Sequence, residues 1–220
     1  MNKKTHPLKD LSLREIYDKL YGFYGPQHWW PGDTSLEVAV GAILTQNTNW
    51  NNVEKAISNL KEHKMLNAKV INHMPVDQLA FRIRSSGYYN VKANRLRAFI
   101  DFLIGRYGGS MARMKKGRTE TLRRELLAVN GIGQETADSI LLYSLCKPVF
   151  VIDAYTKRVL SRHGIMDVNA SYEKYQEIFH RDLDEDVTVF NEYHALLVKV
   201  GKEHCSPQPV CEGCPLSIDN

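Results

Sequence analysis

Residues 126–145, LLAVNGIGQETADSILLYSL, carry the clearest structural signal in the chain. Apolar residues recur at three- and four-residue steps on both sides of Gly131-Ile132-Gly133, which predicts two helices joined by a tight turn. Glycine permits positive φ and lets a ligand approach the backbone closely. The turn also places backbone N–H groups at the positive end of the second helix, where a phosphate binds well. An ordinary αα-hairpin remains the alternative interpretation of these residues.

The same helical periodicity runs through most of the chain. Strand alternation is nearly absent, and only PVFVID at 148–153 resembles a strand. Asp33 and Thr34 can cap a helix that begins at Ser35, and Gly108, Gly109 and Gly164 lie where helices should end. We therefore expect an all-α fold, with helices in the segments 11–25, 35–46, 51–63, 91–108, 121–129, 135–146, 154–164, 171–183 and 187–205.

The bulk composition excludes several classes of protein. The 220 residues are 43% hydrophobic and 25% charged, which is typical of a globular chain and not a disordered one. No apolar run approaches the ~20 residues that span a bilayer, and the basic N-terminus has no apolar core of a signal peptide. We expect a cytoplasmic monomer. The net charge of +4 is compatible with nucleic acid as a partner.

An apolar, proline-containing loop, residues 147–153, follows the hairpin and ends in a carboxylate. Asp153 alone could be the N-cap of the next helix. Hairpin, loop and aspartate together, however, resemble the signature of the helix-hairpin-helix (HhH-GPD) DNA glycosylase superfamily typified by endonuclease III. LTQNTNW (44–50), GYYNVKANRL (87–96) and VGKEHCSPQPVCEGCPL (200–216) are similar to its glutamine loop, its Gly-aromatic-Tyr-Asn-x-Lys-Ala segment and its C-terminal cluster loop.

The resemblance implies an α fold in two domains. Residues 34–145 would form a six-helix barrel that ends in the helix-hairpin-helix. Residues 1–33 and 146–220 would form the second helical domain, with the active site in a cleft between the two. A damaged nucleotide of double-stranded DNA would be flipped into that cleft.

The resemblance also implies the chemistry. The family's catalytic lysine lies eighteen residues before its catalytic aspartate, and here Glu135 stands eighteen residues before Asp153. Schiff-base lyase chemistry needs a neutral amine, which a glutamate does not supply. We therefore expect a monofunctional enzyme, in which ionised Asp153 stabilises positive charge on the sugar or orients the attacking water. A lyase that uses another lysine, such as Lys92 or Lys157, is the alternative.

One subgroup is more similar still. The 3-methyladenine DNA glycosylases of the endonuclease III type carry a Trp-Trp-Pro, a glutamate at the lysine position and an aromatic residue after the glutamine loop. Trp29-Trp30-Pro31, Glu135 and Trp50 match these features. A cationic alkylated base would stack on such rings with about 0.5–2 kcal/mol per ring. The alternatives are that the tryptophans are core residues, or that the enzyme removes a different damaged base.

Contacts with DNA follow from the same resemblance. Gln46 would fill the gap that the flipped nucleotide leaves, and the hairpin would hold a phosphate through backbone amides. A non-catalytic DNA-binding protein that keeps the hairpin is the remaining alternative. The residues expected to contact DNA are Gln46, Asn47, Lys92, Asn130, Gly131, Ile132 and Gly133.

The C-terminal cysteines are spaced Cys205-x5-Cys211-x2-Cys214. Clustered cysteines in a cytosolic protein favour a metal site over disulfides. Endonuclease III-like proteins bind a [4Fe–4S] cluster here with four cysteines, and Asn220 occupies the expected fourth position. We expect a cluster held by the three cysteines, with a zinc site or a vestigial site as alternatives. Cys146 is expected to be a buried core thiol.

Overall fold

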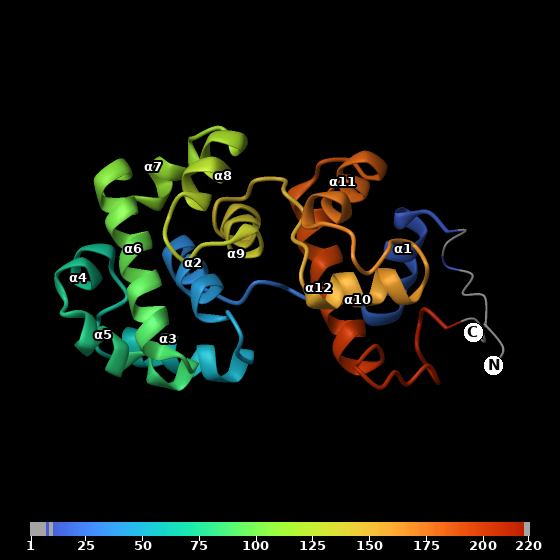
Figure 1. The fold of residues 1–220 in the computed structure, drawn as a ribbon, viewed down its shortest axis with the longest axis horizontal. Coiled ribbons are helices and arrows are strands. Elements are labelled where there is room, and N and C mark those ends of the chain that lie inside the picture. The colour runs from blue at the N-terminus through green and yellow to red at the C-terminus, as the bar shows by residue number, and fades with distance from the viewer. Residues whose placement is uncertain (1–7, 9–10, 218–220) are drawn as a thin grey trace. The chain divides into compact units, whose positions relative to one another are not determined.

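The structure is a computed structural model that describes residue 8 and residues 11–217. Within that part of the chain every regular element is a helix, which confirms the all-α fold (Figure 1). The apolar segment 148–153 is irregular and not a strand. Contacts along the chain define two compact units. The first contains the chain up to Trp29 and from Pro148 onwards, and the second runs from Trp30 to Lys147.

The helix α2 (Ser35–Leu44) lies in the core of the second unit. Every residue from Glu37 to Leu44 is buried, as expected for a helix that is apolar on all sides. Thr34 caps it by accepting a hydrogen bond from the amide of Glu37, as predicted. The other helices of this unit before the hairpin turn are α3 (Trp50–Glu62), α4 (Ala68–His73), α5 (Val76–Arg82), η2 (Arg84–Ser86), α6 (Tyr89–Tyr107), α7 (Met111–Lys115) and α8 (Thr119–Leu127).

The second hairpin helix departs from the single regular helix that the sequence predicts. It begins as α9 (Gln134–Ser139) and continues as one π-helical turn, η3 (Ile140–Ser144). The amide of Leu145 donates to the carbonyl of Ile140, five residues back. All five residues of η3 are buried, and the turn packs against α2. Insertions of this kind are common at functional sites.

The first unit is built around α12 (Val187–Glu203), which packs against α1 (Leu13–Tyr24) and α10 (Ala154–Arg162). The remaining helix is α11 (Tyr172–Asp182). The core of the first unit contains a group of aromatic rings. Phe150 stacks on Phe179 with ring centroids 3.6 Å apart, and Tyr193 meets both rings edge-on. The loop that leads to Asp153 is therefore fixed by packing of Phe150.

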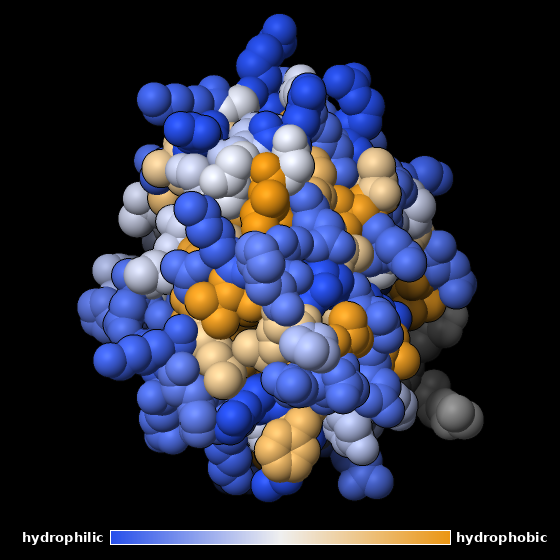
Figure 2. All heavy atoms as spheres, turned by 90° about the vertical axis from the view of Figure 1, so that its left-hand side faces the viewer, coloured by the Kyte–Doolittle hydropathy of each residue, from blue (hydrophilic) through white to orange (hydrophobic). Residues whose placement is uncertain are grey.

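Figure 2 shows the face of the second unit that lies at the left of Figure 1, where α4 and α5 are found. Hydrophobic residues appear on it as small separate groups in a mostly hydrophilic surface. Isolated apolar residues of this kind are common on protein surfaces. No helix of the described residues is long and apolar enough to cross a membrane.

Lys92 connects three elements of the second unit from inside. Its side chain is buried, and its ammonium donates to the carbonyls of Leu44, at the end of α2, and Ser86, in η2, at 2.8 and 2.5 Å. Burial, aided by the nearby charge of Arg95, lowers the pKa of Lys92 from 10.5 to about 8. The prediction that Lys92 contacts DNA is therefore wrong, because both carbonyls lie within the protein and the ammonium is out of reach of a phosphate.

We expect the free energy of unfolding to rise between about pH 8 and pH 10.5 through Lys92. In this window the unfolded chain keeps the lysine proton while the folded protein has released it, so raising the pH favours folding. Other groups titrate in the same window, so the comparison is between wild type and Lys92→Met in denaturant titrations at several pH values. The unfolding free energy of Lys92→Met should rise less with pH than that of wild type. An identical pH dependence of the two proteins would contradict the lowered pKa of Lys92.

Candidate nucleic-acid interface and active-site residues

The hairpin turn lies between α8 and α9 in the second unit. Gly131 has φ +83°, a conformation that favours glycine, and the amide of Ile132 donates to the carbonyl of Val129. Gly133 is the N-cap of α9 and brings no side chain that could cap it. Asn130 and Gly133 are exposed, whereas the Ile132 side chain is buried. The buried Ile132 side chain thus anchors the turn in the core, and the backbone at Gly133 is exposed and accessible to a ligand.

The glutamine loop meets the hairpin. Gln46 follows α2, and its side-chain nitrogen donates to the carbonyl of Gly131 at 3.1 Å and to the hydroxyl of Thr136 at 2.9 Å. Its side-chain oxygen accepts a hydrogen bond from Arg95 of α6. Asn47, next in the loop, is exposed and has φ +52°, which is uncommon for a residue other than glycine. The structure therefore brings two segments that were predicted to bind DNA into direct contact.

An aromatic group lies beside α2 in the same unit. The Trp30 ring meets Trp50 edge-on with centroids 5.3 Å apart and lies 5.0 Å from Tyr143. A Cβ on Gly41 would lie 3.2 Å from Nε1 of Trp30, so the indole rests directly on α2. Tyr143 was not predicted, because its position in η3 resembles any buried helical residue. Trp29 belongs to the first unit, where the ammonium of Lys202 lies 5.8 Å from its ring centroid.

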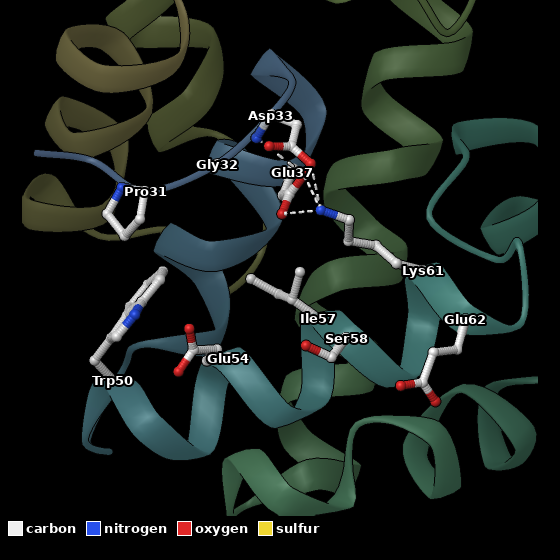
Figure 3. Close-up of a pocket in the computed structure, with 10 residues that line it drawn as sticks. All are labelled: Pro31, Gly32, Asp33, Glu37, Trp50, Glu54, Ile57, Ser58, Lys61 and Glu62. Carbon is white, nitrogen blue, oxygen red and sulfur yellow. Dashed lines mark hydrogen bonds and ion pairs between the residues drawn. The ribbon is translucent and has the colours of Figure 1, made fainter.

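Pro31 and Trp50 line a pocket of about 410 Å³ between the segment before α2 and the face of α3 (Figure 3). Its volume lies in the range of small-molecule sites. Lys61 forms ion pairs with Asp33 and Glu37 at 2.6 and 3.0 Å. The lining also contains Glu54 and Glu62, so four carboxylates surround a single lysine. The indole of Trp50 beside excess negative charge suits a flat cation.

Asp153 is fixed within the first unit. One carboxylate oxygen, Oδ1, accepts a hydrogen bond from the amide of Thr156 at 2.7 Å, so Asp153 caps α10. The other, Oδ2, lies 3.6 Å from Nε2 of buried His194 on α12. Burial lowers the pKa of His194, against the opposing effect of Asp153. Burial therefore favours the neutral form of the imidazole.

Glu135 lies on the second unit. It is exposed in the first turn of α9, where the helix dipole favours a carboxylate. Its carbonyl accepts a hydrogen bond from the hydroxyl of Ser139 at 2.7 Å. The side chain that replaces the family's lysine therefore stands at the surface, beside the hairpin turn.

The cysteine loop is held by arginines of α10. Arg162 donates to the sulfur of Cys205 at 3.3 Å and to the carbonyls of Ser206 and Pro207, and Arg158 donates to the carbonyl of Cys205. Cys205 and Cys214 are buried, and Cys211 is exposed. Burial, together with the other two cysteines, raises the pKa of the Cys214 thiol.

Within residue 8 and residues 11–217, no three His, Cys, Asp or Glu side chains are arranged to hold a metal ion. The described residues thus do not by themselves fit the expected [4Fe–4S] cluster, and Asn220 lies outside them. The cluster stays a prediction, which iron analysis of the purified protein tests. Cys146, predicted to be buried, is exposed, because it follows the end of η3 with φ +51° and points away from the core.

Comparisons with known proteins identify the family. Residues 40–184 match the model of the HhH-GPD superfamily of base excision DNA repair proteins. A protein of Methanocaldococcus jannaschii, provisionally named a DNA repair glycosylase, is 48% identical over 206 residues, which are 93% of each chain. Endonuclease III of Thermotoga maritima is 30% identical over 180 residues, covering 81% of this chain and 79% of its own.

Solved structures show the same fold. The 3-methyladenine DNA glycosylase MagIII of H. pylori, bound to 1,N6-ethenoadenine, has a TM-score of 0.77 at 28% identity and covers 88% of this chain and 98% of its own. The protein of a non-covalent endonuclease III–DNA complex has a TM-score of 0.79 at 22% identity, and the match covers 92% of this chain and 91% of that protein.

The two hairpin glycines should respond differently to alanine. A Cβ on Gly131 would lie 2.3 Å from Cγ of Arg95 at positive φ, so Gly131→Ala should lower the unfolding free energy by roughly 2 kcal/mol or more. No heavy atom lies within 4 Å of a Cβ on Gly133, so Gly133→Ala should fold normally. Its methyl group should still obstruct a phosphate and weaken DNA binding about tenfold, which is ~1.4 kcal/mol.

Thermal unfolding and titration with a duplex that contains a stable abasic analogue separate the two effects. The affinity should also fall with salt, because phosphate contacts release counterions. Unchanged affinity of Gly133→Ala, together with no dependence on salt, would show that the turn does not bind phosphate.

Proposed function

Because the chain belongs to the HhH-GPD superfamily of base excision DNA repair proteins, we propose that it is a monofunctional DNA glycosylase for cationic alkylated purines. In this proposal it hydrolyses the bond between the base and its sugar and leaves the strand uncut, with 3-methyladenine as the best candidate base. The observation that carries the substrate class is the group of Trp30, Trp50 and Tyr143 beside a pocket with excess carboxylates.

Charge supports a cationic base. Alkylation at N3 of adenine puts positive charge on the ring, which aromatic faces attract. Such a base leaves without protonation, so the site needs no general acid. Pro31 and Trp50 line a pocket whose carboxylates outnumber its single lysine, and the chain shares 28% identity with a solved glycosylase named for 3-methyladenine.

Asp153 is proposed to stabilise the positive charge that develops on the sugar as the base leaves. The Thr156 amide holds one oxygen, and neutral His194 lies beside the other, so the carboxylate keeps a fixed orientation. A preoriented charge of this kind requires no rearrangement during the reaction. The same carboxylate can orient the water that attacks the sugar.

Neither Glu135 nor the two lysines named as alternatives favours lyase chemistry. Glu135 replaces the family's lysine, and a carboxylate forms no Schiff base. Lys92 is buried with its ammonium bonded to two carbonyls, so no sugar reaches it. The ammonium of Lys157 lies 5.4 Å from the ring centroid of Tyr175 on α11, a cation–π contact within the first unit.

Phosphate contacts are proposed for the exposed backbone of the hairpin turn, with Asn47 and Asn130 beside it. Both asparagines are exposed on loops that Gln46 joins through its bond to Gly131. Backbone and amide contacts of this kind fix the position of a protein on DNA without reading its sequence.

The proposal predicts release of methylated purines from methylated duplex DNA, with strand breaks only after alkali treatment. Asp153→Asn should nearly abolish release and retain DNA binding, because it removes the charge while the side-chain oxygen can still cap α10. Chromatography of released bases and a borohydride trapping assay measure both points. A trapped lysine adduct would contradict the monofunctional assignment, and release of oxidised pyrimidines instead of methylated purines would contradict the substrate class.

Trp30→Ala should reduce release of methylated bases by one to two orders of magnitude, in line with a stacking platform worth ~1–3 kcal/mol. Trp30→Phe should retain much of the activity, because it keeps an aromatic face on α2. Both variants are compared with wild type at equal folded fraction, measured by thermal unfolding. Equal activity of Trp30→Ala and wild type would show that Trp30 is only a core residue.

A further inference from the structure

Arg95 lies directly against the hairpin turn. A Cβ on Gly131 would be 2.3 Å from Cγ and 2.8 Å from Cδ of Arg95, so the aliphatic part of this side chain packs on the turn's backbone. The guanidinium at its end donates to the side-chain oxygen of Gln46. Arg95 thus touches the turn and the glutamine loop at once, from a third element, α6.

The Gln46 amide is held in a single orientation by these neighbours. Arginine only donates and the Gly131 carbonyl only accepts, so the amide oxygen must face Arg95 and the nitrogen must face Gly131. The hydroxyl of Thr136 accepts the second N–H bond at 2.9 Å. The side-chain oxygen and both N–H groups of Gln46 therefore all form hydrogen bonds, which fixes the rotamer of this side chain.

The start of the glutamine loop is fixed from the same helix. Lys92 and Arg95 are three residues apart on α6 and so share one face of it. Lys92 binds the carbonyl of Leu44, the last residue of α2, and Arg95 binds the side chain two residues further on. The loop is therefore secured at its backbone and at its functional side chain.

We propose that Arg95 is a positioning residue that fixes Gln46 against the hairpin turn, so that the side chain expected to enter the duplex and the turn expected to hold the phosphate keep a constant spacing before DNA binds. The inference rests on the proposed function of both segments. A preformed arrangement lowers the ordering cost of binding. Arg95 acts through Gln46 in this scheme, and its guanidinium does not contact phosphate.

The decisive variant is Arg95→Met, which keeps an unbranched chain on Gly131 and removes the donor to Gln46. Arg106→Met is the matched control: it removes the same charge from α6, where Arg106 is exposed and pairs with Glu125. Binding to a duplex with a stable abasic analogue is measured over a range of salt concentrations. This readout needs no base release, so it stays informative if the proposed substrate class fails.

Arg95→Met should weaken binding five- to tenfold with an unchanged salt slope, and Arg106→Met should weaken it less than twofold. In a Gln46→Ala background, Arg95→Met should have no further effect. The proposal would be overturned if Arg95→Met lowered the affinity equally in the wild-type and Gln46→Ala proteins. It would also be overturned if the slope of log affinity against log salt were smaller by about 0.9 in Arg95→Met, because Arg95 would then contact phosphate itself.

Two further measurements separate positioning from a general structural role. The side-chain amide signals of Gln46 in NMR spectra of the free protein should shift in Arg95→Met and stay in place in Arg106→Met. If Arg95→Met folds poorly, Arg95→Lys keeps the charge and the chain but not the reach of the guanidinium, and it should also shift the Gln46 signals. Unshifted Gln46 signals in a folded Arg95 variant would overturn the proposal.

Discussion

The close approach of Arg95 to the backbone of Gly131 is the constraint on which the candidate DNA-binding surface depends. A side chain at Gly131 would clash with Arg95, which would have to move away from the turn and from the side-chain oxygen of Gln46. Two independent constraints therefore require glycine at this position. Its positive φ is a constraint of the local backbone, and the close approach of Arg95 is a constraint of tertiary packing. Glycine at this position thus joins three elements that are far apart in the sequence.

Sequence reasoning succeeded where the signal is local. The all-α fold follows from helical periodicity, and the cap at Thr34 and the hairpin glycines follow from backbone chemistry. It was wrong for Lys92 and Cys146, because burial depends on what packs against a residue and not on its own neighbours in the chain. It missed Arg95, His194 and Tyr143 for the same reason, since each meets its partner only after distant helices pack together.

The tryptophans show why two interpretations of one residue need not compete. Trp30 rests on α2 at Gly41 and touches Trp50 and Tyr143, so it is part of the packing of the second unit. It is nevertheless only partly buried, as is Trp50, which lines the adjoining pocket. A ring that is fixed by its own packing loses little entropy when a base stacks on it, so a structural role favours the binding role.

Asp153 likewise combines two roles that the sequence leaves as alternatives, a helix cap and a proposed catalytic group. The cap uses one carboxylate oxygen, at 2.7 Å from the Thr156 amide, and so sets the rotamer of the whole side chain. The position of the second oxygen is then set by the cap on α10, and this oxygen lies 3.6 Å from Nε2 of His194. A neutral imidazole lies beside this oxygen without cancelling the carboxylate charge, whereas a protonated one would neutralise the pair. Burial of His194, which lowers its pKa, therefore preserves the negative charge that a developing sugar cation needs.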